Sequence, residues 1–271
     1  MEIKNKPRSE PRYFSDRLKK KLDGIRNEPS VIVEAPPGYG KTTAVRDHLK
    51  KSLPQSVPVY WFTATDEEPP VCFRRFADEI GKIYQRAGQR LLAAGLPNAA
   101  TIGEACDALR SIECRHEAFL VLDNFQYLLA VLPLSFFTAL IEHGGAGLHI
   151  VVVTQMLKRN MLSAIAGRGV RHISAGDLRL SADDIIRYYS QAGVRIGRED
   201  AQAIARNTGG WIIAVSLQLR AFRETGTFSD TAGILTLMEH LVWDKLTEAQ
   251  QTFLLRLSPF EMVTAQQACF L

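Results

Sequence analysis

The segment Ala35-Pro-Pro-Gly-Tyr-Gly-Lys-Thr-Thr43 sets two glycines, a lysine and two threonines at a spacing suited to holding phosphate groups. It fits the template G-x-x-x-x-G-K-[ST] of a phosphate-binding loop, except that Ala35 stands at the first glycine. In that chemistry the Lys41 ammonium reaches the β- and γ-phosphates and the Thr42 hydroxyl ligates Mg²⁺, while backbone amides surround the phosphate oxygens. The predicted nucleotide-binding loop consists of Pro37, Gly38, Tyr39, Gly40, Lys41, Thr42 and Thr43.

A second residue that can carry chemistry is Asp123, at the end of the apolar run 118–122. An acid at the carboxyl end of a buried strand stands where α/β sheets bind their ligands. Together with a phosphate loop it would be the Walker B acid, which holds Mg²⁺ directly or through water. The competing interpretation is an aspartate that caps the turn into the next helix. Because a phosphate loop precedes it, we favour the metal role and predict Thr42 and Asp123 as the Mg²⁺ ligands.

The elements on either side of the loop decide whether it can bind phosphate. The β-branched run 31–33 predicts a buried strand, and 41–53 predicts a helix whose N-terminus points amide donors at the loop. The competing interpretation is a Gly-Pro turn before an amphipathic helix, with Lys41 as an ordinary solvated residue. A cation in the first turn opposes the helix dipole, whereas strand, loop and helix occur in the order that a phosphate site requires. The context therefore favours the phosphate site.

The rest of the first half predicts a parallel sheet. Further strands are expected at 58–63, 118–122 and 149–153, and a helix is expected at 71–84. All of these strands are continuously apolar, which is typical of a parallel sheet that is covered on both faces by its crossover helices. The predicted fold class is therefore α/β, a P-loop NTPase parallel sheet with helices on both faces, followed by a small helical domain.

From Leu178 onward the sequence has no β-rich runs and predicts a second, helical domain. Ser181 and Asp184 have the S-x-x-[DE] spacing of an N-terminal capping pair, which predicts that a helix starts there. Helices are expected at 181–192, 199–206, 210–222, 231–241 and 247–257. Because the sequence stops in the apolar stretch 268–271, we expect the natural chain to continue.

Composition limits the classes of function. The 271 residues are 46% hydrophobic, which is enough for a large core, and a formal charge of +4 spread along the chain does not by itself indicate nucleic-acid binding. The basic run 17–21 includes an apolar stripe and is interpreted as a solvated helix face. The four cysteines lack metal-binding spacing, the start has no secretory signal, and no apolar run could span a bilayer. We therefore expect a cytoplasmic protein without a membrane partner.

Six segments follow one another in an order that is specific to a family, although the phosphate loop alone is not. They are Ala35-Pro-Pro-Gly-Tyr-Gly-Lys-Thr-Thr43, Trp61-Phe-Thr-Ala-Thr-Asp-Glu-Glu68, Leu120-Val-Leu-Asp-Asn-Phe125, Leu178-Arg-Leu-Ser-Ala-Asp-Asp184, Thr208-Gly-Gly-Trp211, and Trp243-Asp-Lys-Leu246 leading to Leu254-Leu-Arg-Leu-Ser258. Together they resemble the N-terminal part of the MalT-like regulators, the large LuxR-type members of the STAND class of signal-transduction ATPases. The resemblance covers nearly the whole chain.

The resemblance implies four parts: an arm and first helix at 1–27, a nucleotide-binding domain at 28–176, a helical domain at 177–240, and the start of a winged-helix domain at 241–271. It places the adenine pocket between the segment 13–17 and the helical domain. The implied ligands are ATP or ADP with Mg²⁺, and the implied partner of the full-length protein in its ATP state is a second copy. In this family the sensor and the DNA-binding helix-turn-helix come later, so DNA would bind only through a C-terminal domain that is absent from this chain.

Departures from the family pattern concern hydrolysis. Asn124 stands where relatives usually carry a second acid, which orients or deprotonates the attacking water, and Gln126 stands where a histidine is common. Gln155 stands where relatives often place an arginine that senses the γ-phosphate. An amide cannot take a proton from water at neutral pH, and a neutral glutamine carries no charge to stabilise a developing anion. We therefore predict that Asp123, Asn124 and Gln155 decide catalysis, with nucleotide binding intact and hydrolysis slow.

Three functions remain open at this stage. The leading hypothesis is an ATP/ADP-binding switch module of a signal-responsive transcriptional activator, in which ADP holds the helical part against the nucleotide domain. The alternative is a P-loop small-molecule or nucleotide kinase, although the only basic residues for a lid are Lys158, Arg159 and Arg168. The third is a remnant that binds no nucleotide, against which the intact Lys41-Thr42-Thr43 argues.

Overall fold

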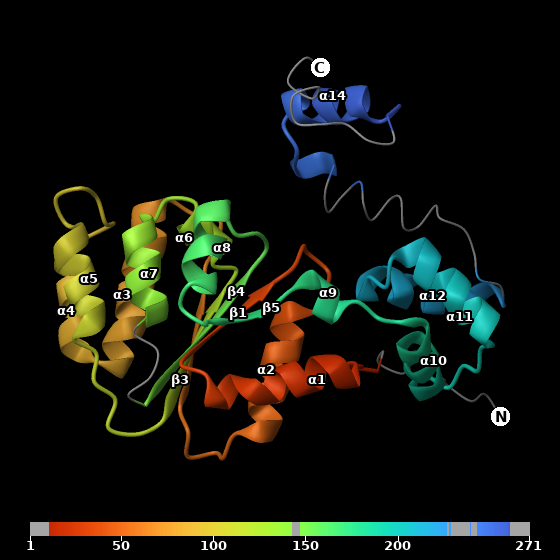
Figure 1. Cartoon of the computed structure of the whole chain (residues 1–271), viewed down its shortest axis with the longest axis horizontal. Helices are drawn as coiled ribbons and strands as arrows, with labels where there is room; N and C mark the ends of the chain where they lie inside the picture. The colour runs from red at the N-terminus through yellow and green to blue at the C-terminus, as the bar shows by residue number, and fades with distance from the viewer. Residues whose placement is uncertain (1–10, 143–146, 227, 229–238, 240–242, 261–271) are drawn as a thin grey trace, which may run out of the picture.

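Five parallel strands form the sheet at the centre of the molecule (Figure 1). The computed structural model describes residues 11–142, 147–226, 228, 239 and 243–260. The strands are β1 (Ser30–Glu34), β2 (Val59–Thr63), β3 (Ala118–Asp123), β4 (Leu148–Thr154) and β5 (Arg171–Ile173), in the spatial order β2-β3-β4-β1-β5. The parallel α/β sheet and its four predicted strands are thus confirmed. The sequence does not predict β5, because its three residues include a single apolar side chain, Ile173.

Helices precede, connect and follow the strands. In the sheet-forming part they are α1 (Asp16–Asp23), the 3-10 helix η1 (Gly24–Asn27), α2 (Lys41–Ser52), α3 (Pro69–Ile83), α4 (Gln85–Ala94), α5 (Ile102–Arg110), α6 (Gln126–Leu129), α7 (Leu134–Glu142), α8 (Arg159–Ala166) and α9 (Ala175–Leu178). They are followed by α10 (Ala182–Gln191), α11 (Arg198–Thr208), α12 (Ile212–Thr225), the 3-10 helix η2 (Trp243–Lys245) and α14 (Glu248–Leu257). The helix predicted at 71–84 begins earlier, because a proline suits the first helical position.

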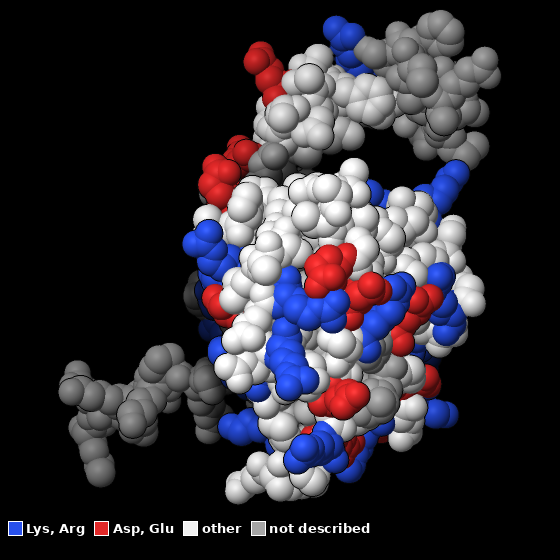
Figure 2. Space-filling view, turned by 90° about the vertical axis from the view of Figure 1, so that its left-hand side faces the viewer, with Lys and Arg blue, Asp and Glu red and all other residues white. Residues whose placement is uncertain are grey.

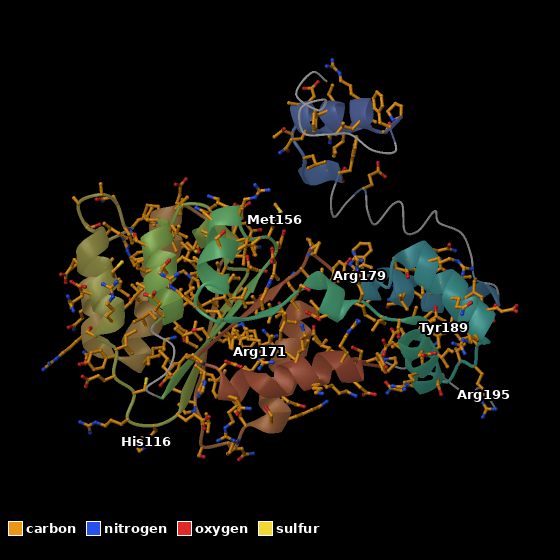
Figure 3. The ribbon with its side chains drawn as sticks, in the orientation of Figure 1. His116, Met156, Arg171, Arg179, Tyr189 and Arg195 are labelled. Atoms are coloured by element: carbon orange, nitrogen blue, oxygen red, sulfur yellow. The ribbon has the colours of Figure 1, made fainter. Side chains whose placement is uncertain are left out.

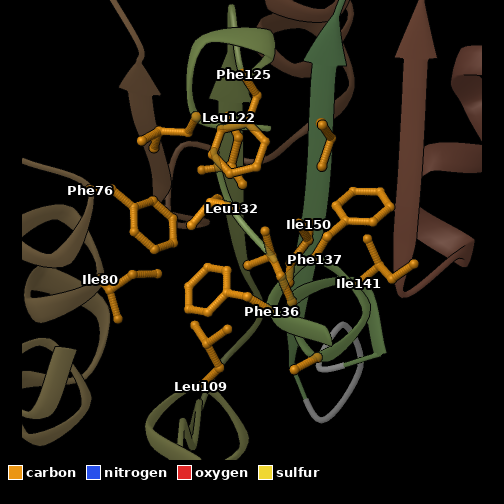
Figure 4. Packing of buried hydrophobic residues seen from close by; sticks show 14 of the residues in the cluster. Phe76, Ile80, Leu109, Leu122, Phe125, Leu132, Phe136, Phe137, Ile141 and Ile150 are labelled. Carbon is orange, nitrogen blue, oxygen red and sulfur yellow. The ribbon is translucent and has the colours of Figure 1, made fainter. Parts of the chain in front are cut away.

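The sheet is covered on both faces, as predicted. Successive strand side chains point to opposite faces, so Ile32, Leu120 and Ile150 pack with α3, α4, α5, α7 and α8 in one core. Figure 4 shows part of this core, with Leu122 of β3 and Ile150 of β4 near Phe136 of α7. Val31 and Val151 pack with α1 and α2 in the other core. Because both faces are apolar, the strands show the continuous hydrophobic runs of a buried parallel sheet.

The carboxyl ends of the strands meet at one edge of the sheet. Glu34 of β1 lies beside Thr154 of β4, and Thr63 of β2 lies beside Asp123 of β3. Figure 3 shows Met156, just past β4, and His116, just before β3, at opposite ends of the sheet. The loop that follows β1 and the acid that ends β3 therefore share an edge, with the end of β4 between them.

The helices α10 to α12 pack around a separate core that includes Ile185, Tyr188 and Tyr189, and Tyr13 from the N-terminal arm joins it. The predicted capping pair is confirmed, because the Asp184 amide donates to the Ser181 hydroxyl over 3.2 Å. Along the chain, Leu178 packs with α1 and α2, whereas Leu180 packs with the helical core. The division of the chain at 176/177 into two domains stays a proposal.

Near the C-terminus the structure describes η2 and α14, and no residue of α14 is buried. The helix predicted at 231–241 falls almost entirely on residues 229–238 and 240–242, outside the described part of the chain. Residues 261–271 are outside it as well. The predicted start of a winged-helix domain at 241–271 therefore stays a prediction.

Basic and acidic side chains are interspersed on the surface that Figure 2 shows, and no single-sign patch dominates that face. One ion pair of the described structure joins Arg90 of α4 to Glu104 of α5, with Nε and Oε1 2.7 Å apart. Among the described helices, none has both the length and the hydrophobicity needed to cross a bilayer.

Candidate functional site

The predicted phosphate loop occupies the turn between β1 and α2. Gly38 and Gly40 have φ angles of +76° and +77°, a region that side chains with a Cβ rarely adopt. Gly40 is also the residue that caps α2, so Lys41 and Thr42 form the first turn of that helix. The free amides and the positive dipole end of the helix therefore point toward the loop, which is the arrangement that binds anions.

Lys41 is folded back onto the loop and buried, with 9% of its surface exposed. Its Nζ donates to the carbonyl oxygens of Ala35 at 2.6 Å and Pro36 at 3.0 Å. Burial lowers the pKa of this ammonium to about 8, although the nearby Asp123 carboxylate opposes the shift. A buried ammonium held mainly by neutral carbonyls gains strongly from an anionic partner, so this side chain suits a phosphate ligand.

Asp123 and Thr42 lie together, as the sequence predicts. The Thr42 hydroxyl donates to Asp123 Oδ1 over 2.8 Å, and the Asn124 amide donates to the same oxygen over 3.0 Å. Mg²⁺ binds oxygens octahedrally at about 2.0–2.1 Å, so two adjacent ligands lie about 2.9 Å apart. The spacing of the two side-chain oxygens therefore fits a shared Mg²⁺. No cluster of three or more metal-binding side chains occurs in the described ranges, so water and phosphate would complete the coordination.

Thr154, which ends β4 between the loop strand and the Asp123 strand, is a candidate that the sequence analysis missed. Its side chain is fully buried, and its hydroxyl has no hydrogen-bond partner among the described residues. Leaving a buried polar group unpaired costs stability, so such a group at a binding edge points to a missing partner. A threonine directly after the apolar run 150–153 is the signal that could have identified it.

Asn124, Gln126 and Gln155, which the sequence analysis connects with hydrolysis, lie outside the predicted phosphate loop. Asn124 has a φ of +52°, and Gln126 has a side-chain amide with no partner in the described structure. Gln155 is half-buried and follows β4 directly. The segment after it is held to the loop strand, because Glu34 Oε1 accepts from the Leu157 amide at 2.8 Å. The structure thus brings these side chains to the same edge as Asp123 without assigning any of them a hydrolytic contact.

A cavity of about 320 Å³ opens beside the phosphate loop. It is lined by Tyr13 and Phe14 of the N-terminal arm, by Gly40 and Thr43 of the loop, and by Ile212 and Ile213 of α12. Its size falls in the range of small-ligand sites, and its largely apolar walls suit a flat aromatic base. It lies between the arm and the helical unit, where the family resemblance places the adenine.

The N-terminal arm is fixed to both sides of this cavity. The Tyr13 hydroxyl donates to Asp184 Oδ1 over 2.8 Å, and burial together with that carboxylate raises the pKa of the phenol. Arg12 pairs with Asp47 of α2 at 2.6 Å. The arm therefore connects the helical unit to the sheet-forming part of the chain across the cavity.

Comparisons with known proteins place the fold. No protein-family model matches the chain, and no curated protein matches it. A Walker-type ATPase of Pyrococcus abyssi aligns with a TM-score of 0.55 at 13% identity, over 95% of this chain and 80% of that one. A STAND protein with a tetratricopeptide repeat sensor from Pyrococcus horikoshii aligns at 0.47 and 17% identity, over 99% of this chain and 38% of that one.

AMPPCP-bound DnaA from Aquifex aeolicus aligns with a TM-score of 0.40 at 11% identity, over 76% of this chain and 60% of that one. At such identities a structural likeness shows the fold alone. The alignment with the Walker-type ATPase, together with the sheet order, shows that this chain has the α/β fold of the P-loop ATPases.

Proposed function

We propose that this chain is an ATP/ADP-binding switch module with slow ATP hydrolysis. The observation that carries the proposal is the group formed by the buried Lys41 ammonium and the Thr42–Asp123 pair, which opens beside the apolar cavity. The cation, the pair of metal ligands and the base-sized pocket follow one another in space in the same order as the phosphates, the metal ion and the base of a bound nucleotide.

In this proposal Lys41 leaves the Ala35 and Pro36 carbonyls and pairs with the β- and γ-phosphates, while the loop amides surround the phosphate oxygens. Thr42 and Asp123 hold Mg²⁺, which neutralises phosphate charge when bound. The base enters the cavity between the arm and α12. Every one of these contacts serves binding, and the chain contains all the side chains that they require.

Hydrolysis needs a group that orients or deprotonates water, and this chain has neutral side chains at the two positions where such a group is expected. Asn124 follows Asp123 in place of a second acid, and Gln155 is neutral where a positive charge would stabilise the transition state. The Thr154 hydroxyl can donate to the γ-phosphate or to a water, but it is a poor base. We expect turnover well below the median enzyme rate of about 10 per second.

The finer role rests on the six-segment resemblance: a cytoplasmic, signal-responsive transcriptional activator that self-associates in its ATP state and contacts DNA through a further domain. The helical unit meets the nucleotide-binding part at the arm and at the cavity wall, among other places, and this supports a switch because a nucleotide bound there would touch both units. A ligand that contacts two units can shift the equilibrium between their docked and separated arrangements.

The test separates binding from cleavage by single-turnover assays of Mg²⁺-ATP with the parent and an Asn124→Asp variant. The parent should bind ATP and cleave it slowly, and the restored acid should raise the rate at least about tenfold while affinity stays within about twofold. Vigorous hydrolysis by the parent would contradict the proposal, and so would an Asn124→Asp variant that binds ATP without any gain in rate. Transfer of phosphate to an added small molecule would favour the kinase alternative.

A further inference from the structure

The turn Thr208-Gly-Gly-Trp211 joins α11 to α12, and its geometry is fixed by contact with the segment that leads into α10. The Leu180 amide donates to the Gly210 carbonyl over 2.9 Å. Gly210 has a φ of +70°, and a Cβ there would lie 2.3 Å from the Leu180 carbonyl oxygen. Only glycine fits this position. Because the turn is held against Leu180, the position of the next residue, Trp211, is fixed as well.

Trp211 is directed onto the phosphate loop. Its Nε1 donates to the Pro37 carbonyl over 3.1 Å, and its ring centroid lies 6.3 Å from that of Tyr39. A Cβ on Gly38 would lie 2.9 Å from the Trp211 ring and equally close to Ile213. The first turn of α12 therefore packs directly against the backbone of the loop, and the closeness of that packing gives Gly38 a second reason to be glycine.

The hydrogen bond fixes one peptide plane of the loop. In a trans peptide the carbonyl and the following amide point in opposite directions, so a Pro37 carbonyl held by Trp211 turns the Gly38 amide away from Trp211. Trp211 is not among the residues that line the cavity, whereas Ile212 and Ile213 are. Its polar contact is thus with the phosphate-binding backbone and not with the base pocket.

We propose that Trp211 is a positioning residue for phosphate binding, an inference that rests on the proposed function. Its indole N–H holds the Pro37 carbonyl so that the Gly38 amide faces the phosphates, which makes phosphate affinity depend on the docked helical unit. By linkage, phosphate in the loop stabilises that docking to the same extent. The helical unit thus responds to phosphate through a route that is separate from the base.

The experiment compares Trp211→Phe, which keeps an apolar ring and removes the N–H donor, with Trp61→Phe as the matched control. The Trp61 Nε1 is buried and has no partner among the described residues, so its loss removes no hydrogen bond. Affinities for ADP, pyrophosphate and adenosine are measured by titration calorimetry in Mg²⁺.

We expect Trp211→Phe to lower the affinities for ADP and pyrophosphate by about three- to tenfold, as the loss of one hydrogen bond would. The affinity for adenosine should stay within about twofold of that of the parent. Trp61→Phe should leave all three affinities unchanged. Equal losses for ADP and adenosine would mean a merely structural role and would overturn the inference, as would unchanged ADP binding in Trp211→Phe. A parent that binds none of these ligands would refute the proposed function itself, which is a different outcome.

A second measurement uses the parent, so it does not depend on how the variant folds. The three tryptophans give three indole N–H resonances, and the spectra of Trp61→Phe and Trp243→Phe assign two of them, so the remaining resonance belongs to Trp211. Saturating pyrophosphate, which has no base, should shift the Trp211 resonance and leave that of Trp61 in place. A stationary Trp211 resonance in a pyrophosphate-saturated protein would overturn the inference.

Discussion

Polar side chains at the two ends of the central sheet differ in the partners that they have. At the amino end, Arg26 donates to both Glu117 carboxylate oxygens at 2.8 and 2.7 Å, and Arg171 donates to Glu28 at 2.6 Å. At the carboxyl end, Lys41 rests on neutral carbonyls and the Thr154 hydroxyl has no partner in the described structure. Glu34 at the carboxyl end is paired, because it accepts from the Leu157 amide and lies 2.7 Å from His172 Nε2. The Lys41 ammonium there has no ion pair and the Thr154 hydroxyl has no hydrogen bond within the described structure, so these two groups are left for a ligand.

This difference separates structural polar groups from functional ones without reference to any relative. Buried polar groups in folded proteins are nearly always paired, so an end that leaves them unpaired gives up stability. A loss of that kind is expected where a ligand supplies the partner. The comparison therefore predicts that substitutions at the carboxyl end change nucleotide affinity, whereas substitutions at the amino end change only the free energy of unfolding.

The largest expected effect is at Lys41. Lys41→Ala removes the principal cation on the phosphates, so affinities for ATP and ADP should fall at least about tenfold by titration calorimetry. Arg26→Ala, which removes a cation from the amino end, should leave both affinities unchanged. The contrast between the two ends fails if both variants bind like the parent or if both lose affinity equally.

A pH titration gives the next largest effect. Lys41 has its pKa lowered to about 8 in the nucleotide-free protein, and phosphate binding favours the protonated form. Between about pH 7 and pH 8 the affinity should therefore be nearly level, and above about pH 8 it should fall by at most about tenfold per pH unit, because binding then requires the uptake of a proton. Nucleotide phosphates are already ionised in this range, with a second pKa of about 6. In Lys41→Ala the profile should be flat, and a parent profile without this decline would show that Lys41 does not face the phosphates.

Two buried hydroxyls provide the finest comparison. Ser30, at the amino end of β1, donates to the Ile141 carbonyl over 2.6 Å, whereas Thr154 has no partner in the described residues. Ser30→Ala should cost about 1 kcal/mol of unfolding free energy and leave nucleotide affinity unchanged. Thr154→Val should leave the free energy of unfolding unchanged. It should lower the affinity for ATP a few-fold more than the affinity for ADP, because only ATP has a γ-phosphate that the Thr154 hydroxyl can contact. Denaturant unfolding measures the stability of each variant, and titrations with ATP and with ADP measure its affinities. A loss of ATP affinity in Ser30→Ala, or a loss of stability without a loss of ATP affinity in Thr154→Val, would contradict the comparison.

What could be predicted from the sequence depended on local spacing. The phosphate loop, Asp123 and the four long strands each depend on residues within about ten positions of one another, and the structure bears out the loop geometry and the sheet. The Ser181–Asp184 cap is local as well. These features need no knowledge of which strand lies beside which.

The features that were missed depend on contacts between distant segments. Thr154 gains its position only because β4 lies between β1 and β3, and Trp211 reaches Pro37 across 174 residues of sequence. The short strand β5 forms because β1 offers an edge, and its own residues give no β pattern. The Arg26–Glu117 pair likewise joins residues 91 positions apart and has no motif.

The most direct test of the central claim is an equilibrium titration of ATP into the nucleotide-free protein, once with excess Mg²⁺ and once with a chelator. We predict saturable binding of one ATP per chain that weakens when the metal is removed, because Thr42 and Asp123 share it with the phosphates. Absence of saturable binding to the folded protein would contradict the account. Binding that is the same with and without Mg²⁺ would contradict the metal roles of Thr42 and Asp123.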